Sequence, residues 1–299
     1  MAAEQQLSAA VSIAALSPDA QRERRTRLTG LLLISPAVIL TFLFLLFPLV
    51  FIVQMSFTSG KSFLSAGGAT FTTENFVAMA GRYLPNVLVT VQLAALSMVA
   101  NLIFGFPFAY ILVRKVRYRD LVRALMVFPM FGALYIAFGI RFLLLPGGPA
   151  SPFLEALGIS NLSVLYGLPT VVFAMSVFTF PFMVMNIGTA LSNVDPKLEE
   201  AAACLGARPW QTFGRILLPL TRSGMVAGSL MVFGWNLGTF AEPTLLGTLN
   251  EQRSLAVTLY NRGVVQADYG LSSAMAIVLL VLAFGVSYLS LRYSRGALV

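Results

Sequence analysis

The residues best suited to chemistry in this chain lie close together near residue 240. Trp235, Thr239 and Glu242 stand at i, i+4 and i+7, which places them on one face if the segment is a helix. A carboxylate beside an indole ring attracts an organic cation through charge and cation–π interaction. The pattern therefore predicts a binding face for a cationic solute, with Asn236 beside it. The alternative is that Glu242 caps the end of a helix and faces water, since Pro243 follows it directly.

A second charged residue inside an apolar segment is Arg141. Its long side chain could extend to lipid headgroups, pair with Glu242, or bind an anionic or zwitterionic solute. Tyr135 lies in the same segment and belongs to the predicted set of pathway residues. Ionisable groups are costly inside a membrane, so their presence in a span indicates function.

Several kinds of catalytic site are excluded by composition. The chain has no histidine and one cysteine, Cys204. This rules out histidine-based metal centres, catalytic triads that use histidine, and disulfide frameworks. We expect no covalent chemistry from this chain, no metal and no cofactor.

The same composition is typical of a membrane protein. Of 299 residues, 58% are hydrophobic and 11% are charged, whereas about 25% of a soluble domain is charged. Apolar segments of about 20 residues recur, which is the length that a helix needs to cross a bilayer. We predict an all-α polytopic membrane protein with six transmembrane helices. Their expected bounds are Leu31–Met55, Val87–Val113, Leu121–Leu145, Val164–Ala190, Ser223–Leu245 and Leu271–Leu291.

Basic residues predict the orientation of these helices. If the N-terminus is cytoplasmic, the inside segments are 1–30, 114–123, 191–222 and 292–299, and they hold 15 of the 20 Lys and Arg residues. Cytoplasmic loops carry such an excess of positive charge. Both termini are therefore expected in the cytoplasm, and the net charge of +8 reflects topology rather than nucleic-acid binding.

The predicted topology divides the chain into four parts. Residues 1–30 form a cytoplasmic tail, and residues 31–86 hold the first transmembrane helix and an external loop. Residues 87–291 form a core of five helices, and residues 292–299 are a cytoplasmic C-terminus. The first 27 residues lack the basic start of a cleavable signal peptide, so the first helix is expected to be an uncleaved anchor.

The inside segment 191–222 begins with a strong helix-start signal. Asp195 suits an N-cap, and Pro196 suits the first helical position because its missing N–H would have no partner there. Good helix formers follow from Lys197 to Leu205. Gly206 can adopt the left-handed conformation that ends a helix.

A second short helix is expected after this glycine. Arg208 and Pro209 suit its start, and we predict that it continues to about Leu217, where Pro219 breaks it. The segment is therefore expected to be two helices hinged at Gly206.

Each of these two helices has one apolar face. The first presents Leu198, Ala201, Ala202 and Leu205, and the second presents Trp210, Phe213 and Leu217. An apolar face on a polar loop must be covered by something. A helix lying on lipid headgroups would have a basic polar face, whereas Glu199 and Glu200 make the first helix acidic. We therefore predict that the segment docks on another protein.

Residues 200–219 resemble the signature of the membrane permease subunits of binding-protein-dependent ABC importers. That signature is Glu-Ala-Ala, three residues, Gly, nine residues and Ile-x-Leu-Pro. Its seven positions are filled here by Glu200, Ala201, Ala202, Gly206, Ile216, Leu218 and Pro219. The second predicted span also resembles the start of the family's transport core, at Thr90, Gly105, Pro107, Ala109 and Tyr110.

The resemblance implies a type I ABC importer permease fold in a bacterial inner membrane. It implies that the segment 191–222 contains the helix that couples the permease to an ATPase subunit. The expected coupling residues are Glu200, Ala201, Ala202, Gly206, Arg208, Ile216 and Pro219. The ATPase must be a separate dimer, because this chain has no G-x-x-x-x-G-K-[ST] phosphate loop. A second homologous permease subunit and an external solute-binding protein are the other implied partners.

Two stretches, 181–207 and 240–247, resemble spermidine/putrescine-type permeases, which implies a polyamine substrate. Relatives that move phosphonates, ferric ions or opines imply the alternatives. A secondary transporter is a rival, but it would show an inverted repeat and several acidic groups near the midplane. A membrane-embedded enzyme is a third alternative. It would need a cluster of His, Asp, Glu or Cys at the membrane surface, and the sequence offers none.

Overall fold

A computed structural model describes residues 18–58, 71–158, 160–247 and 253–295. It has two compact units, Met1–Gln54 and Met55–Val299. The first is dominated by α2 (Pro18–Ser56), which has Pro36 and Pro48 inside it. Its part Ile34–Ser56 is long and apolar enough to span a membrane. The predicted Leu31–Met55 span is therefore helical, but the helix begins well before it. The first 17 residues of the predicted tail, and residues 296–299, lie outside the described residues.

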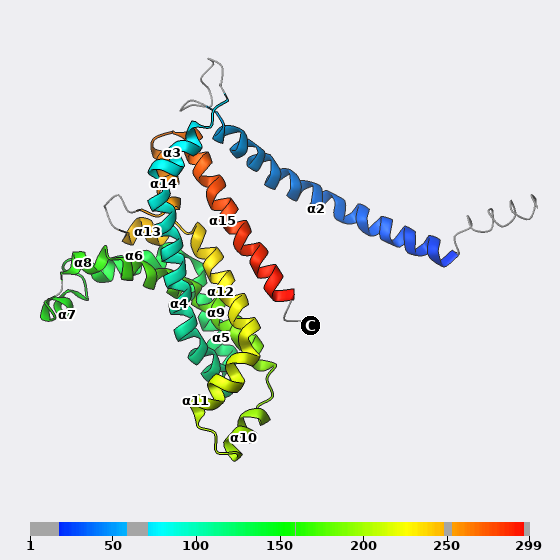
Figure 1. Cartoon of the computed structure of the whole chain (residues 1–299), viewed down its shortest axis with the longest axis vertical. Helices are drawn as coiled ribbons and strands as arrows, with labels where there is room; N and C mark the ends of the chain where they lie inside the picture. The colour runs from blue at the N-terminus through cyan, green and yellow to red at the C-terminus, as the bar shows by residue number, and fades with distance from the viewer. Residues whose placement is uncertain (1–17, 59–70, 159, 248–252, 296–299) are drawn as a thin grey trace, which may run out of the picture. The chain divides into compact units, whose positions relative to one another are not determined.

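Four long helices run side by side in the second unit (Figure 1). They are α4 (Leu84–Arg114), α9 (Leu168–Ser192), α12 (Leu218–Gly238) and α15 (Tyr269–Arg295). One core cluster joins α4, α9 and α12 through buried apolar residues such as Phe106, Ile187 and Val232. Asn101 of α4 donates a 2.7 Å hydrogen bond to the Thr179 hydroxyl of α9, a buried polar contact between two helices.

The predicted third span is not one straight helix. Instead, α5 (Arg119–Val127) and the 3₁₀ turn η1 (Phe128–Phe131) are followed by α6 (Ala133–Leu144), with a bend of 82° between the two parts. The continuous helix predicted over Leu121–Leu145 is therefore wrong. Pro129 supplies no N–H to a preceding turn and Gly132 leaves the helix, so the two together end α5 and redirect the chain.

The predicted fifth span begins earlier and ends earlier than expected. Its helix runs without a break from α11 (Pro209–Thr212) through a π turn, η2 (Phe213–Leu217), into α12. The predicted break at Pro219 is wrong, because the π turn shifts the hydrogen bonding where the proline N–H is missing. The helix ends at Gly238, and α13 (Ala241–Leu246) starts a new one. In a continuous helix Pro243 would clash with the carbonyl of Thr239.

Short helices fill the two ends of the unit and one side. One end carries α3 (Glu74–Arg82), α14 (Leu255–Tyr260) and the π turn η3 (Asn261–Val265). The other end carries α10 (Lys197–Cys204) and α11, and α7 (Ser151–Ala156) and α8 (Asn161–Leu165) lie beyond α6 (Figure 1). The predicted start of the fourth span at Val164 is wrong, because this residue lies in α8.

The described residues contain five helices long and apolar enough to cross a membrane, or six if the bent α5–α6 pair is one span. The prediction of six spans therefore depends on that pair. The described secondary structure is helical apart from one isolated bridge between Thr58 and Phe71.

Close packing of α9 against α12 depends on Gly224 and predicts a mutational effect. A Cβ atom on Gly224 would lie 2.5 Å from the Ala190 Cβ and 2.6 Å from the Asn186 carbonyl oxygen. We expect Gly224→Ala to destabilise the purified protein by about 1–3 kcal/mol, as other overpacked sites are. A Cβ on Gly228 would mainly meet the flexible Met183 side chain, with its sulfur at 2.9 Å. Gly228→Ala is the matched control with a smaller loss, and equal melting temperatures for the two variants would contradict this account.

Candidate functional site

The short helix α10 has well-defined ends. The Asp195 side chain accepts a 2.9 Å hydrogen bond from the Lys197 N–H, and the Asp195 carbonyl accepts one from Leu198. The predicted N-cap is therefore confirmed. Gly206 has φ +82°, and its N–H and that of Ala207 bond back to the Ala203 and Ala202 carbonyls. This is a Schellman ending, so the predicted left-handed glycine is also confirmed.

Most of the α10 surface is exposed within the described chain. Ala202 is buried, but Leu198, Ala201 and Leu205 are exposed, and Leu205 has 89% of its surface accessible. Removing a leucine side chain from water is worth about 1.5–3 kcal/mol. Of the predicted apolar face, only one residue is covered by the chain itself.

The second predicted helix changes from exposed to buried along its length. Trp210 is exposed, the Phe213 ring meets the Phe106 ring edge-on at 4.9 Å, and Leu217 is buried. At its start, the Gln211 side chain accepts a 2.8 Å hydrogen bond from the Arg208 N–H. The predicted start at Arg208 and Pro209 is confirmed. Because this helix continues into α12, α10 is connected through one short turn to a long helix of the bundle.

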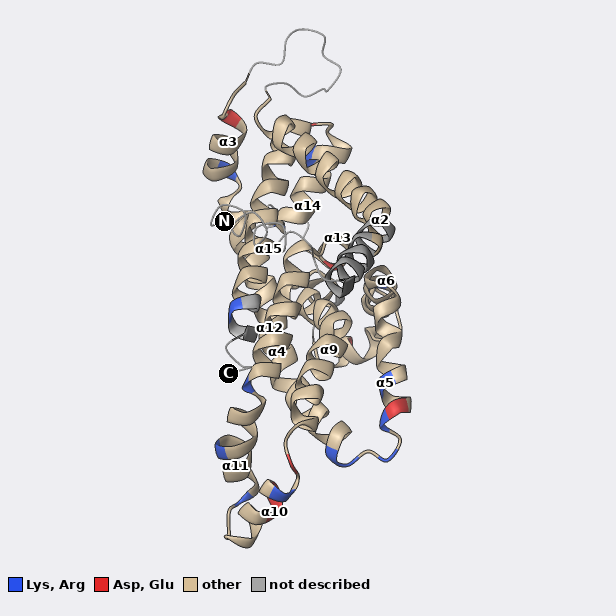
Figure 2. Ribbon diagram, turned by 90° about the vertical axis from the view of Figure 1, so that its right-hand side faces the viewer, with Lys and Arg blue, Asp and Glu red and all other residues tan. Residues whose placement is uncertain are grey.

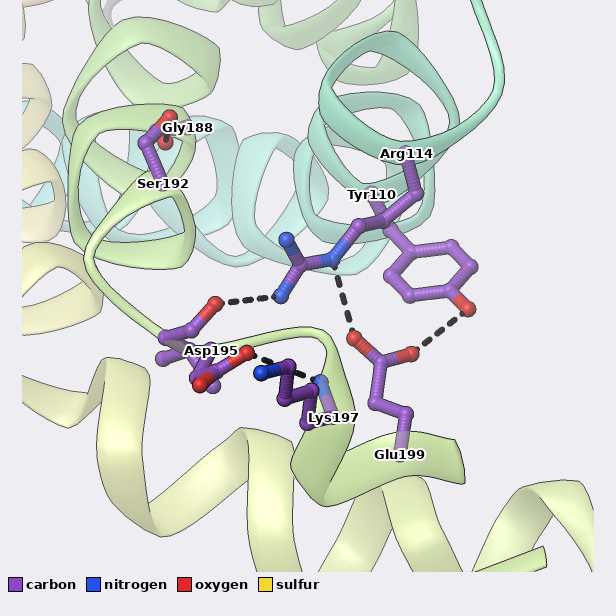
Figure 3. Close-up of polar contacts among 8 residues, drawn as sticks. Tyr110, Arg114, Gly188, Ser192, Asp195, Lys197 and Glu199 are labelled. Atoms are coloured by element: carbon purple, nitrogen blue, oxygen red, sulfur yellow. Dashed lines mark hydrogen bonds and ion pairs between the residues drawn. The ribbon is translucent and has the colours of Figure 1, made fainter. Parts of the chain in front are cut away.

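A partly buried polar cluster joins α10 to α4 (Figure 3). The Arg114 Nε atom donates to one carboxylate oxygen of Glu199 at 2.9 Å, and the Tyr110 hydroxyl donates to the other at 2.9 Å. Another Arg114 nitrogen donates to the Val194 carbonyl at 2.8 Å. The Arg114 and Glu199 side chains are only 14% and 18% exposed. We call Tyr110, Arg114 and Glu199 the α4–α10 link.

A second candidate surface runs along α9 and α12. Trp235 of α12 is half-exposed, and its ring lies 5.6 Å from those of Phe178 and Phe182 on α9. Further along, Asn186 and Thr189 of α9 and the C-cap residue Asn193 follow at helical spacing. These residues and Ser223 of α12 line an open hollow of about 340 Å³. We call this surface, aromatic in one part and polar in the next, the α9–α12 face.

The predicted grouping of Trp235, Thr239 and Glu242 on one helical face is wrong. The helix ends at Gly238, and Thr239 is extended. Glu242 lies in the first turn of α13, where its carboxylate accepts a 2.6 Å hydrogen bond from the Thr239 hydroxyl. It is 1% exposed, so the alternative that it faces water is also wrong. Asn236 is buried too, and its amide nitrogen has no hydrogen-bond partner within the described parts of the chain.

The two remaining predicted pathway residues lie on α6. Arg141 is partly buried, and it donates a 3.0 Å hydrogen bond to the Leu245 carbonyl at the end of α13. A cation near the C-terminal carbonyls of a helix is favourable. Tyr135 is exposed, near the start of α6. Neither residue lies on the α9–α12 face.

Residues 12–296 match the family described as "Binding-protein-dependent transport system inner membrane component". This match covers almost the whole chain. The chain belongs to this family. It is an inner-membrane permease, a transport component rather than an enzyme.

Relatives of this permease include permease proteins of ABC transporters. The spermidine/putrescine transport system permease protein PotB of Escherichia coli (strain K12) is 31% identical over 198 residues, which cover 63% of this chain and 72% of PotB. The inner membrane ABC transporter permease protein YdcU of the same organism is 32% identical over 177 residues, 54% of this chain and 56% of YdcU. These likenesses confirm the predicted resemblance to ABC importer permeases.

Solved structures give the same fold for the permease. A chain of a bacterial ABC transporter involved in the import of the acidic polysaccharide alginate matches with a TM-score of 0.72 and 21% identity, over 91% of this chain and 98% of that chain. The MetNI methionine ABC transporter, in an inward-facing conformation, matches with a TM-score of 0.54 and 19% identity, over 71% and 94%. The predicted fold of an ABC importer permease is thereby confirmed.

Sequence reasoning about the permease missed the α4–α10 link. Tyr110 and Arg114 stand four residues apart, so both point from the same face of α4. Glu199 precedes Glu200 and therefore points about 100° away from it around α10. These spacings show that each set of side chains shares or leaves a helical face. They do not show that Arg114 pairs with Glu199, because the two residues are 85 apart in the chain.

Proposed function

We propose that this permease forms half of a polyamine pathway and is driven by a separate ATPase dimer that docks on α10. The observation that carries the proposal is the exposed, sharply capped helix α10, joined directly to the long helices of the bundle. Its exposed Leu205 and Leu198 supply an apolar contact. The Glu200 carboxylate is also exposed and forms no ion pair with any described residue, which leaves it available to a basic residue of the ATPase.

The other proposed coupling residues support this helix. Ala201 permits close approach of the partner surface. Ala202 is buried and packs α10 against the rest of the chain, and Gly206 provides the turn that ends the helix. Arg208 begins the helix that leads through Ile216 and Pro219 into α12. Movement of α10 would thus be passed to α12 along a continuous helix.

Charge supports the proposed orientation. Basic residues gather at the end of the bundle formed by α10, α11 and the start of α5 (Figure 2). By the positive-inside rule this end faces the cytoplasm. The proposal includes cytoplasmic termini, a bacterial inner membrane, and an external binding protein that delivers the solute at the other end. One of the similar structures is an alginate transporter in complex with a periplasmic protein that carries an alginate pentasaccharide.

The α9–α12 face is the proposed wall of the solute pathway. Thr189 and Ser223 are exposed and Asn186 is partly exposed in the single chain, although all three lie within helices that qualify as membrane spans. Polar groups in a span normally face protein or a water-filled space rather than lipid. We infer that a second, homologous permease subunit covers this face and leaves a path between the two.

The polyamine assignment rests on the relatives, on one residue of this face and on one residue of α13. Trp235 offers an exposed aromatic surface to a cation. Apart from this face, Glu242 places a buried carboxyl group, bonded to the Thr239 hydroxyl and near Asn236 in sequence, at the break between α12 and α13. Arg141 and Tyr135 on α6 remain pathway candidates of the proposal, although the Arg141 guanidinium is already bound to the Leu245 carbonyl.

Uptake into proteoliposomes tests the proposed substrate. Vesicles would contain the permease with its partner permease and ATPase, and would receive ATP inside and the binding protein outside. The solute panel would be spermidine, putrescine, a phosphonate and ferric ion. We expect ATP-dependent uptake of a polyamine. Uptake of an anionic solute instead would keep the importer and overturn the polyamine assignment.

Glu242→Gln is expected to lower polyamine uptake at least about fivefold. A unit charge 4 Å from another is worth about 1 kcal/mol even in water and more in a protein, and about 1.4 kcal/mol is tenfold. Glu155→Gln on α7, which removes an exposed carboxylate, is the matched control. Polyamine uptake that is unchanged in Glu242→Gln would remove Glu242 from the pathway.

A further inference from the structure

The helix α10 is held to the bundle at three places, and only two of them are covalent. Its N-terminal end follows α9 through a short turn, and its C-terminal end leads into α11 and α12. The third attachment is the α4–α10 link, which reaches a helix that is 85 residues away in the chain. These attachments connect α10 with α4, α9 and α12, the helices that share one core cluster.

The contacts of the link hold Glu199 from two sides. Each of its carboxylate oxygens accepts one 2.9 Å hydrogen bond from α4, one from the Arg114 guanidinium and one from the Tyr110 hydroxyl. Hydrogen bonds to charged groups are shorter and stronger than neutral ones. Arg114 also donates to the Val194 carbonyl in the turn before α10. The arginine therefore holds both α10 and the turn that precedes it.

Around this link, α10 and α4 are not closely packed. A cavity of about 430 Å³ lies between them and α11, lined by Pro107 and Ile111 of α4, Ala203 of α10 and Pro209 of α11. Glu199 and Tyr110 form part of its wall. Except for Ala202 and the partly covered Glu199, every residue of α10 is exposed. The polar link therefore makes a contact between α4 and α10 where apolar packing is incomplete.

We propose that Arg114 and Tyr110 are positioning residues that make α4 move with α10 when the ATPase moves α10. This rests on the proposed docking of an ATPase on α10. With the link intact, α4, α9 and α12 respond to α10 together. Without it, α10 can shift into the adjacent cavity, and α4 is left to follow only through the apolar core.

The test compares solute transport with ATP consumption in the assembled complex in proteoliposomes. Arg114→Met removes the bonds to Glu199 and Val194, and Tyr110→Phe removes one hydroxyl. We expect the solute transported per ATP hydrolysed to fall about 5- to 150-fold in Arg114→Met, the range of ordinary coupling energies, and to fall less in Tyr110→Phe. Arg123→Met is the matched control, since the Arg123–Asp120 pair is exposed (41% and 86%) and lies away from α10. We expect it to behave as wild type.

A covalent replacement of the link separates transmission from simple folding damage. In a Cys204→Ser background, Arg114→Cys with Glu199→Cys would be joined by a short bifunctional thiosulfonate reagent, which forms a disulfide with each thiol that a reductant can cleave. We expect reagent treatment to restore transport per ATP, and cleavage of the bridge to remove it again.

Two results would overturn the inference. One is an unchanged transport ratio in Arg114→Met, and the other is loss of the ATPase from the complex in that variant, which would make Arg114 a docking residue. If wild type itself shows no ATP-driven transport of any solute, the proposed function fails instead, so the two failures are distinguishable.

Discussion

Replacing Leu205 with aspartate is expected to prevent stable association of the permease with its ATPase. Leu205, the C-cap residue of α10, is 89% exposed, and the proposed docking buries it. A carboxylate placed in an apolar contact without a partner costs about 3 kcal/mol or more, which corresponds to about 150-fold in the dissociation constant. The measurement is the amount of ATPase that copurifies with tagged permease from membranes that contain all subunits.

Two controls make this result specific. Leu205→Met keeps an apolar side chain of similar volume and is expected to retain the ATPase. Leu157→Asp adds the same charge at another exposed leucine, next to α7, and is expected to retain it as well. Wild-type amounts of ATPase with Leu205→Asp would show that α10 does not form the contact.

Replacing Trp235 with alanine is expected to give the largest loss of transport among changes to the α9–α12 face. Its indole packs on Phe178 and Phe182 and leaves half of its surface exposed. A desolvated cation–π contact contributes about 2 kcal/mol, so the uptake rate for a polyamine should fall about 30-fold. The measurement is initial uptake in proteoliposomes at saturating loaded binding protein.

Two control substitutions show whether an aromatic ring at position 235 is what the uptake requires. Trp235→Phe keeps an aromatic surface and is expected to retain most of the uptake. Phe284→Ala removes an exposed ring from α15 (63%, against 50% for Trp235) and is expected to have little effect. A wild-type uptake rate for Trp235→Ala would exclude this face as a wall of the cation pathway.

Local sequence rules predicted α10 well because its ends are set locally. The Asp195 side chain and the left-handed Gly206 act within a few residues of the helix that they bound. The apolar lengths of α4 and α15 were also predictable, since each is a long segment without a break. The family signature at Glu200 and Gly206 follows from the same stretch of sequence.

Breaks within apolar segments were harder to predict. Pro129 and Pro219 both lie in apolar surroundings, yet the first accompanies an 82° bend and the second is accommodated by a π turn. The difference depends on whether neighbouring turns can reorganise their hydrogen bonds. The end of α12 at Gly238 was not predicted either. It separates Trp235 from Glu242, so the predicted common face of these residues does not exist.

The α4–α10 link could not be deduced from local sequence. From the sequence, Arg114 was interpreted as one of the basic residues that indicate topology. Glu199 was interpreted as part of the acidic face of the first short helix. Their pairing depends on how α10 folds back beside the end of α4, which only the three-dimensional arrangement shows (Figure 3).

The most direct test of the account is the ATPase activity of the purified complex with its binding protein, with and without a polyamine, for wild type and Glu200→Ala. We predict that the polyamine-loaded binding protein stimulates hydrolysis in wild type, and that the stimulation is lost in Glu200→Ala because the exposed carboxylate no longer engages the ATPase. Absence of stimulation in wild type with every solute of the panel would contradict the coupling account. Full stimulation in Glu200→Ala would contradict the role of this carboxylate in it.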